Sequence, residues 1–203
     1  NLYSNISPYN YNYAINPKIA GRTITNQTNN PPTTHEEIYV TWEGYRNEDI
    51  IGNKKGIFSR KFETNSNNFS NETKVNTITD GYQSNPSIGL STTGTPIITW
   101  QNNGAVNSSN NGIFASINNG ASFKVNTTND NDASFPAIAV NHQTTNQNEF
   151  VIGWQGKVSY YNEEDYGLAR RRYGITGNSI DPEYATNYGT SGIQTRPSLD
   201  IGS

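Results

Sequence analysis

The sequence predicts an all-β protein built from short, repeated strands. Only 32% of its 203 residues are hydrophobic and 15% are charged, whereas Tyr, Thr, Asn and Gly are abundant. This composition suits strands that are joined by many turns. The hydrophobic residues occur in short alternating runs, and no stretch shows the 3.6-residue periodicity of an amphipathic helix. A chain of this length can bury a core in one domain or in two small ones.

A proline motif recurs at constant spacing. Three segments share it, namely KVNTITDGYQSNPSIGL from Lys74, KVNTTNDNDASFPAIAV from Lys124 and ATNYGTSGIQTRPSLDI from Ala185. In each segment a proline lies eleven residues after the second residue, and Ile or Leu follows two residues later. A weaker copy of the proline element, INPKIA, contains Pro17 and Ile19. The chain therefore contains four proline elements.

Three of the four proline elements are followed by a hydrophobic run that ends in tryptophan. These runs are IYVTW ending at Trp42, PIITW ending at Trp100 and FVIGW ending at Trp154. Strand alternation places each Trp on one face and Thr41, Thr99 or Gly153 on the other, where small residues allow a neighbouring sheet to approach. We therefore expect the three tryptophans to be buried at equivalent positions of three sheets.

A strand that begins with glycine follows each tryptophan run. These strands are GIFSRKF from Gly56, GIFASI from Gly112 and GLARRRY from Gly167. One unit thus has about 50 to 60 residues and four short strands: a Val-Asn-Thr strand, a proline strand, a tryptophan strand and a glycine strand. Four-stranded sheets repeated at this period are typical of β-propeller blades.

Several segments carry a family resemblance, namely Gly-Ile-Phe, Phe-x-Val-Asn-Thr, Gln-x-Asn-Pro-Ser-Ile and Ile-x-Thr-Trp. Through them the chain, from about residue 16 to residue 203, resembles the β-repeats of about 50 residues in large secreted bacterial adhesins and calcium-dependent exoproteins. One hairpin is also similar to the Asp-box of sialidase-type propeller blades, with Asn in place of Asp. Its matching residues are Ser116, Asn118, Gly120, Ser122 and Phe123. The resemblance implies a secreted all-β protein.

The units do not close a ring. The last proline element, RPSLDIGS, ends where a tryptophan strand is expected, and closed propellers typically need at least four blades. We predict three four-stranded propeller-blade-like repeats plus an unfinished fourth half-repeat. The units span about 16–73, 74–123 and 124–184, with a half-unit at 185–203, after an extended N-terminal segment at 1–15.

An unfinished sheet leaves N–H and C=O groups unpaired on an edge strand, which is a template for another chain. Three explanations stay open: the chain is a fragment of a longer repeat array, the half-unit closes an irregular sandwich, or a neighbouring copy completes the edge head to tail. The alternating Tyr and Asn of the N-terminal segment favour the third, although a linker from an upstream domain is the other interpretation of that segment. The expected assembly residues are Tyr9, Tyr11, Tyr13, Pro197, Leu199 and Ile201.

No catalytic constellation is recognisable. His35 and His142 lie in polar, loop-like sequence and are expected at the surface. Arg170, Arg171 and Arg172 alternate between the two faces of a strand, so they cannot form the arginine clamp of a sialidase. We therefore expect no enzymatic activity, no catalytic residues and no cofactor.

Metal, nucleic-acid and membrane binding are not expected either. The oxygen-rich loop at 129–132 suits Ca²⁺ by ligand type but lacks the EF-hand spacing, and the chain has no Cys for a disulfide or thiolate site. The net charge is −3 with no strong basic patch of the kind that binds nucleic acid. No apolar stretch is long enough to span a bilayer.

Six Asn-x-Ser/Thr sequons are candidate N-glycosylation sites: Asn5, Asn26, Asn68, Asn71, Asn107 and Asn126. In a eukaryotic secretory pathway, the sequons in the most loop-like sequence, Asn68, Asn71 and Asn107, are expected to carry sugar first.

We interpret the chain as a non-catalytic extracellular structural protein that assembles with copies of itself into a filament or surface layer. The alternative is a glycan-binding module of a larger secreted adhesin, in which exposed aromatic side chains stack on sugars.

Overall fold

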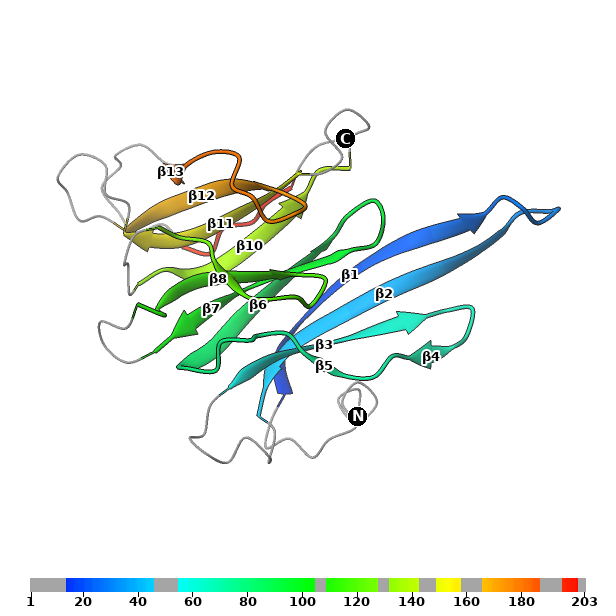
Figure 1. Ribbon diagram of the computed structural model, residues 1–203, viewed down its shortest axis with the longest axis horizontal. Coiled ribbons are helices and arrows are strands. Elements are labelled where there is room, and N and C mark those ends of the chain that lie inside the picture. Colours follow the sequence, from blue (N-terminus) through cyan, green and yellow to red (C-terminus); the bar gives the residue numbers. More distant parts are fainter. Residues whose placement is uncertain are drawn as a thin grey trace.

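The computed structural model describes residues 14–45, 55–104, 109–127, 132–142, 149–157, 166–186 and 195–200, and this part of the chain contains strands but no helix. The strands form three antiparallel sheets that follow one another as an arc (Figure 1). The prediction of an all-β protein with three blade-like repeats is therefore confirmed.

Each sheet follows the order of the chain. Sheet 1 comprises β1 (Ala14–Asn26), β2 (Thr33–Gly44), β3 (Gly56–Glu63), β4 (Asn68–Phe69) and β5 (Thr73–Lys74), and both short strands pair with β3. Sheet 2 comprises β6 (Tyr82–Leu90), β7 (Pro96–Asn103), β8 (Gly112–Ile117) and β9 (Phe123–Lys124). Sheet 3 comprises β10 (Ser134–Val140), β11 (Glu149–Lys157), β12 (Tyr166–Gly174) and β13 (Tyr184–Ala185).

The three sheets pair in one register, which confirms the repeat. On the proline and tryptophan strands the equivalent pairs are Ile19 with Val40, Ile88 with Ile98, and Ile138 with Ile152. Each tryptophan then lies opposite an equivalent residue of the glycine strand, and these pairs are Trp42 with Phe58, Trp100 with Phe114, and Trp154 with Ala169.

The tryptophans occupy the predicted buried positions. Trp42, Trp100 and Trp154 expose only 2%, 1% and 1% of their surface. The first two stack on the phenylalanine of the glycine strand, with ring centroids 6.3 Å apart for Phe58 and 6.4 Å apart for Phe114. Such offset aromatic pairs stabilise a core beyond their buried area alone.

The Val-Asn-Thr element belongs to the preceding sheet. The N–H groups of Val75, Val125 and Thr186 donate to carbonyls of the glycine strands at 2.8, 2.8 and 2.7 Å. The sequence-based units, cut at 73/74, 123/124 and 184/185, therefore divide the outer strands β5, β9 and β13. The boundary is set by backbone pairing, because each outer strand pairs with the glycine strand that comes before it in the chain.

The asparagine of the Val-Asn-Thr motif explains why the neighbouring strand begins with glycine. Asn76 and Asn126 are buried, and their Oδ1 atoms accept the N–H of Ile57 at 2.9 Å and of Ile113 at 2.8 Å. A Cβ on Gly112, whose φ is +134°, would lie 2.3 Å from Asn126 Oδ1. The glycine thus leaves room for the asparagine that caps its strand.

Every proline element begins with the same irregularity. The residues that precede the prolines have φ near +50°, and they are Asn16, Asn85, Phe135 and Arg196. In β1, β6 and β10 the ladder also shifts register at this point. A bulge of this kind bends the strand and re-aims the side chains that follow it.

The proline strands β6 and β10 each pack on the preceding sheet. Ile88 joins Ile57 and Val75 of sheet 1 in one core cluster, and Ile138 joins Ile97 and Ile113 of sheet 2 in another. The apolar faces of neighbouring sheets therefore pack against each other, as in other sheet-on-sheet cores.

Side-chain hydrogen bonds also tie the outer strands of neighbouring sheets. Thr77 N donates to Ser122 Oγ at 2.9 Å, and Ser122 N donates to Thr77 Oγ1 at 3.0 Å. Thr127 donates from its N–H and its hydroxyl to Glu183 Oε2 at 2.7 and 2.9 Å. The threonine of the motif therefore links one sheet to the next.

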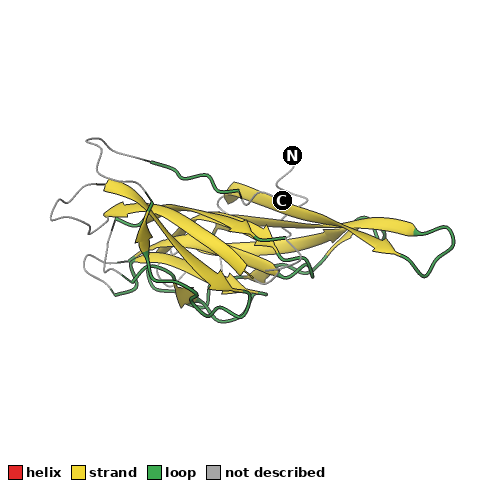
Figure 2. Cartoon of the chain, turned by 90° about the horizontal axis from the view of Figure 1, so that it is seen from above, coloured by secondary structure: helices red, strands yellow, loops and turns green. Residues whose placement is uncertain are grey.

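Sheet 1 differs from the others in its long hairpin. The β1–β2 hairpin projects well beyond the other strands (Figure 2). His35, expected in a surface loop, is instead a half-buried residue of β2 opposite Ile24. His142 is exposed in the loop after β10, as expected.

Replacing Asn126 by Ala is expected to destabilise the protein by about 1 to 3 kcal/mol, because the buried Ile113 N–H loses its acceptor. Urea unfolding followed by tryptophan fluorescence measures the change. Asn71→Ala, at an exposed position between β4 and β5, is the matched control and should change stability by less than about 0.5 kcal/mol. Equal effects of the two substitutions would contradict the capping role.

Candidate assembly surfaces

One face of sheet 1 has no sheet packed on it among the described residues. We call it the start face; it carries Pro17 and Ile19 of β1 and Ile38 and Trp42 of β2. Ile19 is 68% exposed, whereas its counterparts Ile88 and Ile138 are each 9% exposed. The difference arises because each counterpart rests on a preceding sheet.

The start face is hollowed beside Ile19. A groove of about 360 Å³ is lined in part by Ile19, Gly21, Thr23, Glu36 and Ile38. Exposed aliphatic side chains around a groove mark a surface suited to binding another apolar surface.

The indole N–H of Trp42 is the second unusual feature of sheet 1. Among the described residues, Trp42 Nε1 is a buried donor without a hydrogen-bond partner. Tryptophan N–H groups usually find an acceptor when they are buried, and a lost hydrogen bond of this kind costs about 1 to 3 kcal/mol. Because Trp42 is 2% exposed, this unmet donor lies inside the protein and not on the open part of the start face.

The opposite end of the arc carries a single extended segment. We call residues 195–200 the end segment; Pro197 and Leu199 are half-buried, whereas Arg196, Ser198 and Asp200 are exposed. Leu199 Cδ1 lies 3.1 Å from the position that a Cβ on Gly153 would take. The small residue expected at this place thus allows close approach, and the end segment occupies the place of a fourth proline strand on sheet 3.

A hydrogen bond that occurs in two of the units holds the end segment at the position of a proline strand. Glu43 Oε2 accepts the N–H of the bulge residue Asn85 at 2.8 Å, and Gln155 Oε1 accepts that of Arg196 at 3.4 Å. Glu43 and Gln155 each directly follow a tryptophan. The end segment therefore meets sheet 3 as β6 meets sheet 1, but within the described chain no strand pairs with it.

The residue after each tryptophan is not among the site residues that the sequence predicts. The signal was present, since Glu43, Gln101 and Gln155 all carry a side-chain oxygen at this position. It was not recognised because its partner is a backbone N–H of the next unit, which no local pattern reveals.

Several predicted assembly residues lie outside the described residues, namely Tyr9, Tyr11, Tyr13 and Ile201. Of the predicted set, Pro197 and Leu199 are described and lie together in the end segment. The expected N-terminal segment at 1–15 was too long, because Ala14 and Ile15 already pair with Gly44 and Glu43 in β1. Ala14 also packs against the Trp42 cluster.

The arginine run divides between two faces, as predicted. Arg170 and Arg172 both approach Asp181 Oδ2, at 3.7 and 3.3 Å. Arg171 points to sheet 2, where it donates to Val125 O at 3.0 Å. The three guanidinium groups therefore do not converge on one ligand.

The predicted absence of a metal site concerns a loop that is mostly undescribed. Residues 129–131 lie outside the described part, and only Asp132 of this loop is described. Within the described ranges no group of three or more His, Cys, Asp or Glu side chains could hold an ion. In the same ranges no helix has the length and apolar character needed to cross a lipid bilayer.

The sequons fall in different environments. Asn26, Asn68 and Asn71 are exposed, whereas Asn126 is 2% exposed and holds Ile113 N. Asn126 is thus inaccessible in the folded protein. Asn5 and Asn107 lie outside the described residues.

Comparison of the chain with protein-family models, curated proteins and solved structures gives no match. The functional interpretation therefore depends on the geometry of the start face and the end segment.

An ion-pair network stiffens sheet 1 on the face opposite the start face. Glu37 accepts from Arg22 Nε at 2.8 Å and from Lys61 Nζ at 3.1 Å, and Lys61 also pairs with Glu63. Burial acts to raise the pKa of Glu37, but the hydrogen bonds and charges of Arg22 and Lys61 together hold this pKa below its ordinary value. The folded protein therefore favours the ionised carboxylate.

Because the pKa of Glu37 is lowered on folding, its contribution to stability is present at neutral pH and is lost as the pH falls through that lowered pKa. Glu37→Gln is expected to reduce stability by about 1 kcal/mol at pH 7, with the difference from the native protein shrinking on acidification. Denaturant unfolding at a series of pH values measures both. The control, Glu36→Gln on the exposed side of the same strand, should show no such trend; a pH-independent difference for Glu37→Gln would contradict the assignment.

Proposed function

We propose that the protein is a non-catalytic structural protein whose copies assemble head to tail outside the cell, as a filament or surface layer. The observation that carries this proposal is the contrast between Ile19, 68% exposed, and its buried counterparts Ile88 and Ile138. The same motif that joins the sheets within one molecule is thus left available on the start face. An apolar patch that is equivalent to an internal interface is suited to bind the surface that forms that interface elsewhere.

The end segment supplies the complementary half of the contact. It provides the fourth proline element, seated on sheet 3 where Leu199 approaches Gly153, and we take its backbone as the template for strand addition. In the proposed assembly, the N-terminal segment of the next copy pairs with the end segment and completes a fourth sheet. The start face of that next copy then packs on the completed sheet through Pro17 and Ile19.

The N-terminal tyrosines have a specific role in this assembly. Main-chain pairing supplies affinity that depends little on register, whereas Tyr9, Tyr11 and Tyr13, on one side of an extended strand, select the register by filling pockets. The contact joins two different surfaces, so it propagates as a rod or helix unless its rotation closes a ring. The extracellular setting rests on the resemblance of the repeats to those of secreted bacterial proteins.

Ile19→Lys is expected to raise the concentration needed for assembly about tenfold or more, because the buried methylene groups are lost and a charge is placed in the contact. Light scattering and electron microscopy of the full chain over a concentration series measure this. Monomer stability should be unchanged, since Ile19 is exposed in the single chain.

Ile180→Lys is the matched control, because Ile180 is also an exposed aliphatic residue but lies on sheet 3, outside both surfaces. It should assemble as the native chain does. If Ile19→Lys assembles normally, or if both variants fail equally, the start face is not the assembly surface.

Deleting residues 1–13 is expected to leave a folded monomer that no longer polymerises, because β1 begins at Ala14 while the strand that completes the fourth sheet is removed. Circular dichroism and tryptophan fluorescence report the fold, and analytical ultracentrifugation reports the assembly. Filaments formed by the truncated chain would exclude strand completion by this segment. A native chain that stays monomeric at high concentration would favour the fragment explanation instead.

A further inference from the structure

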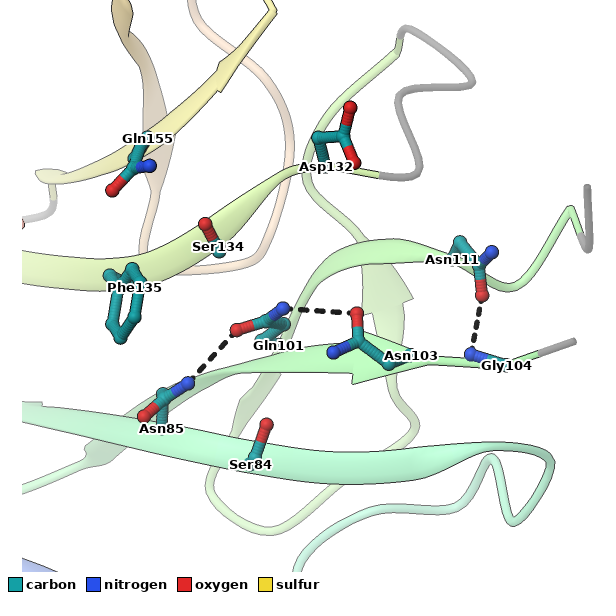
Figure 3. Close-up of a pocket in the computed structure, with 10 residues that line it drawn as sticks. All are labelled: Ser84, Asn85, Gln101, Asn103, Gly104, Asn111, Asp132, Ser134, Phe135 and Gln155. Atoms are coloured by element: carbon teal, nitrogen blue, oxygen red, sulfur yellow. Dashed lines mark hydrogen bonds between the residues drawn. The ribbon is translucent and has the colours of Figure 1, made fainter. Parts of the chain in front are cut away.

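We propose that a cavity between sheets 2 and 3 binds a neutral carbohydrate, a mono- or disaccharide unit of a glycan. The cavity has a volume of about 620 Å³ and lies at the bulges of β6 and β10 (Figure 3). Its size is within the range of about 300 to 1,000 Å³ that is usual for small-molecule sites. This inference does not depend on the proposed assembly.

The four bulge positions share one backbone conformation but carry three different kinds of side chain. Asn16, Asn85, Phe135 and Arg196 all have φ near +50°. Asparagine tolerates this conformation well, whereas for a bulky residue it is strained. Since Asn suffices for the bulge in β1 and β6, the fold does not require a phenylalanine in β10, which points to another role for its ring.

Two of these side chains face the cavity and a third supports it. Asn85 and Phe135 are both lining residues. Figure 3 shows the Phe135 ring directed from β10 toward Asn85 on β6. The Arg196 guanidinium lies 5.1 Å from the centroid of the Phe135 ring, a cation–π contact that holds the ring in place. The cavity thus has one aromatic ring, that of Phe135, in a fixed orientation.

A chain of three amides forms the opposite wall. Asn85 Nδ2 donates to Gln101 Oε1 at 2.9 Å, and Gln101 Nε2 donates to Asn103 Oδ1 at 3.0 Å (Figure 3). The backbone N–H of Asn85 is itself held by Glu43. The remaining amide atoms at the two ends, Asn85 Oδ1 and Asn103 Nδ2, take no part in these bonds and offer one acceptor and one donor at set positions.

The remaining lining favours an uncharged ligand. Besides these residues it contains two hydroxyls, two further amides, a glycine and one carboxylate, which are Ser84, Ser134, Asn111, Gln155, Gly104 and Asp132. Among the described residues that line the cavity there is no Lys or Arg, and the Asp132 carboxylate disfavours anions such as phosphates or acidic sugars. The hydroxyl and amide groups can form hydrogen bonds with a ligand that has several hydroxyls. The aromatic ring beside them can stack on the apolar face of a sugar ring.

The experiment titrates the full chain with four probes: maltose, lactose, N,N′-diacetylchitobiose and, as an anionic comparison, 3′-sialyllactose. Isothermal calorimetry and ligand-observed NMR measure binding. At least one neutral disaccharide is expected to bind with a Kd of about 1 mM or tighter, and sialyllactose no more tightly than lactose. Repeating the titration with the Ile19→Lys variant keeps the result independent of assembly.

Phe135→Asn removes the ring but keeps the residue that the same bulge carries in β1 and β6, so the fold is retained. It is expected to weaken binding about tenfold. Asn103→Ala, at the exposed end of β7, should weaken binding several-fold and carries the test if Phe135→Asn does not fold. Asn65→Ala, in the turn before β4, is the matched control and should bind as the native chain does.

Three results overturn the proposal. The first is the absence of binding by every neutral probe at about 10 mM. The second is binding that Phe135→Asn and Asn103→Ala leave unchanged, which would place the sugar elsewhere. Preferential binding of sialyllactose would likewise contradict a site for neutral ligands.

Discussion

The structure depends on one contact, the packing of each proline strand on the face of the sheet before it. Ile88 rests on Ile57 and Val75 of sheet 1, and Ile138 rests on Ile97 and Ile113 of sheet 2. The bulge before the proline bends the strand at the point where it meets the preceding sheet. This contact has a direction, because a sheet uses its proline strand to bind backward and its opposite face to accept the next unit. Sheets added in this way form an arc with two unlike ends.

Hydrogen bonds between buried amide side chains add to the stability of a core that has few apolar residues. Asn76 Nδ2 donates to Gln83 Oε1 at 3.3 Å, and Gln83 Nε2 donates to Asn102 Oδ1 at 2.8 Å. All three residues are buried, and a buried network of this kind stabilises a fold only when its members find partners. A chain with 32% hydrophobic residues therefore forms defined sheets because its polar side chains join neighbouring strands as well as facing water.

The two ends of the arc have complementary deficits. The start face exposes the apolar side chain of Ile19, whereas the end segment is seated on sheet 3 without a pairing neighbour among the described strands. The proposed assembly supplies both at once, since a completed fourth sheet covers the start face of the next copy. The proposed carbohydrate cavity is lined by residues of sheets 2 and 3 and by none of the residues named for the start face. It adjoins the end segment, because the Arg196 guanidinium lies on the Phe135 ring.

Local alternation determined much of this protein from sequence alone. The faces of Trp42, Trp100 and Trp154, the small residue at Gly153 and the unequal count of strand types all follow from spacing along the chain. Contacts through space decided the rest. The outer strands joined the preceding sheet, β1 began at Ala14, and His35 became part of a strand, because hydrogen-bond partners distant in sequence set these boundaries. The cavity brings Asn85 and Phe135 together from two sheets; only the packing of one sheet on another makes residues fifty positions apart into neighbours.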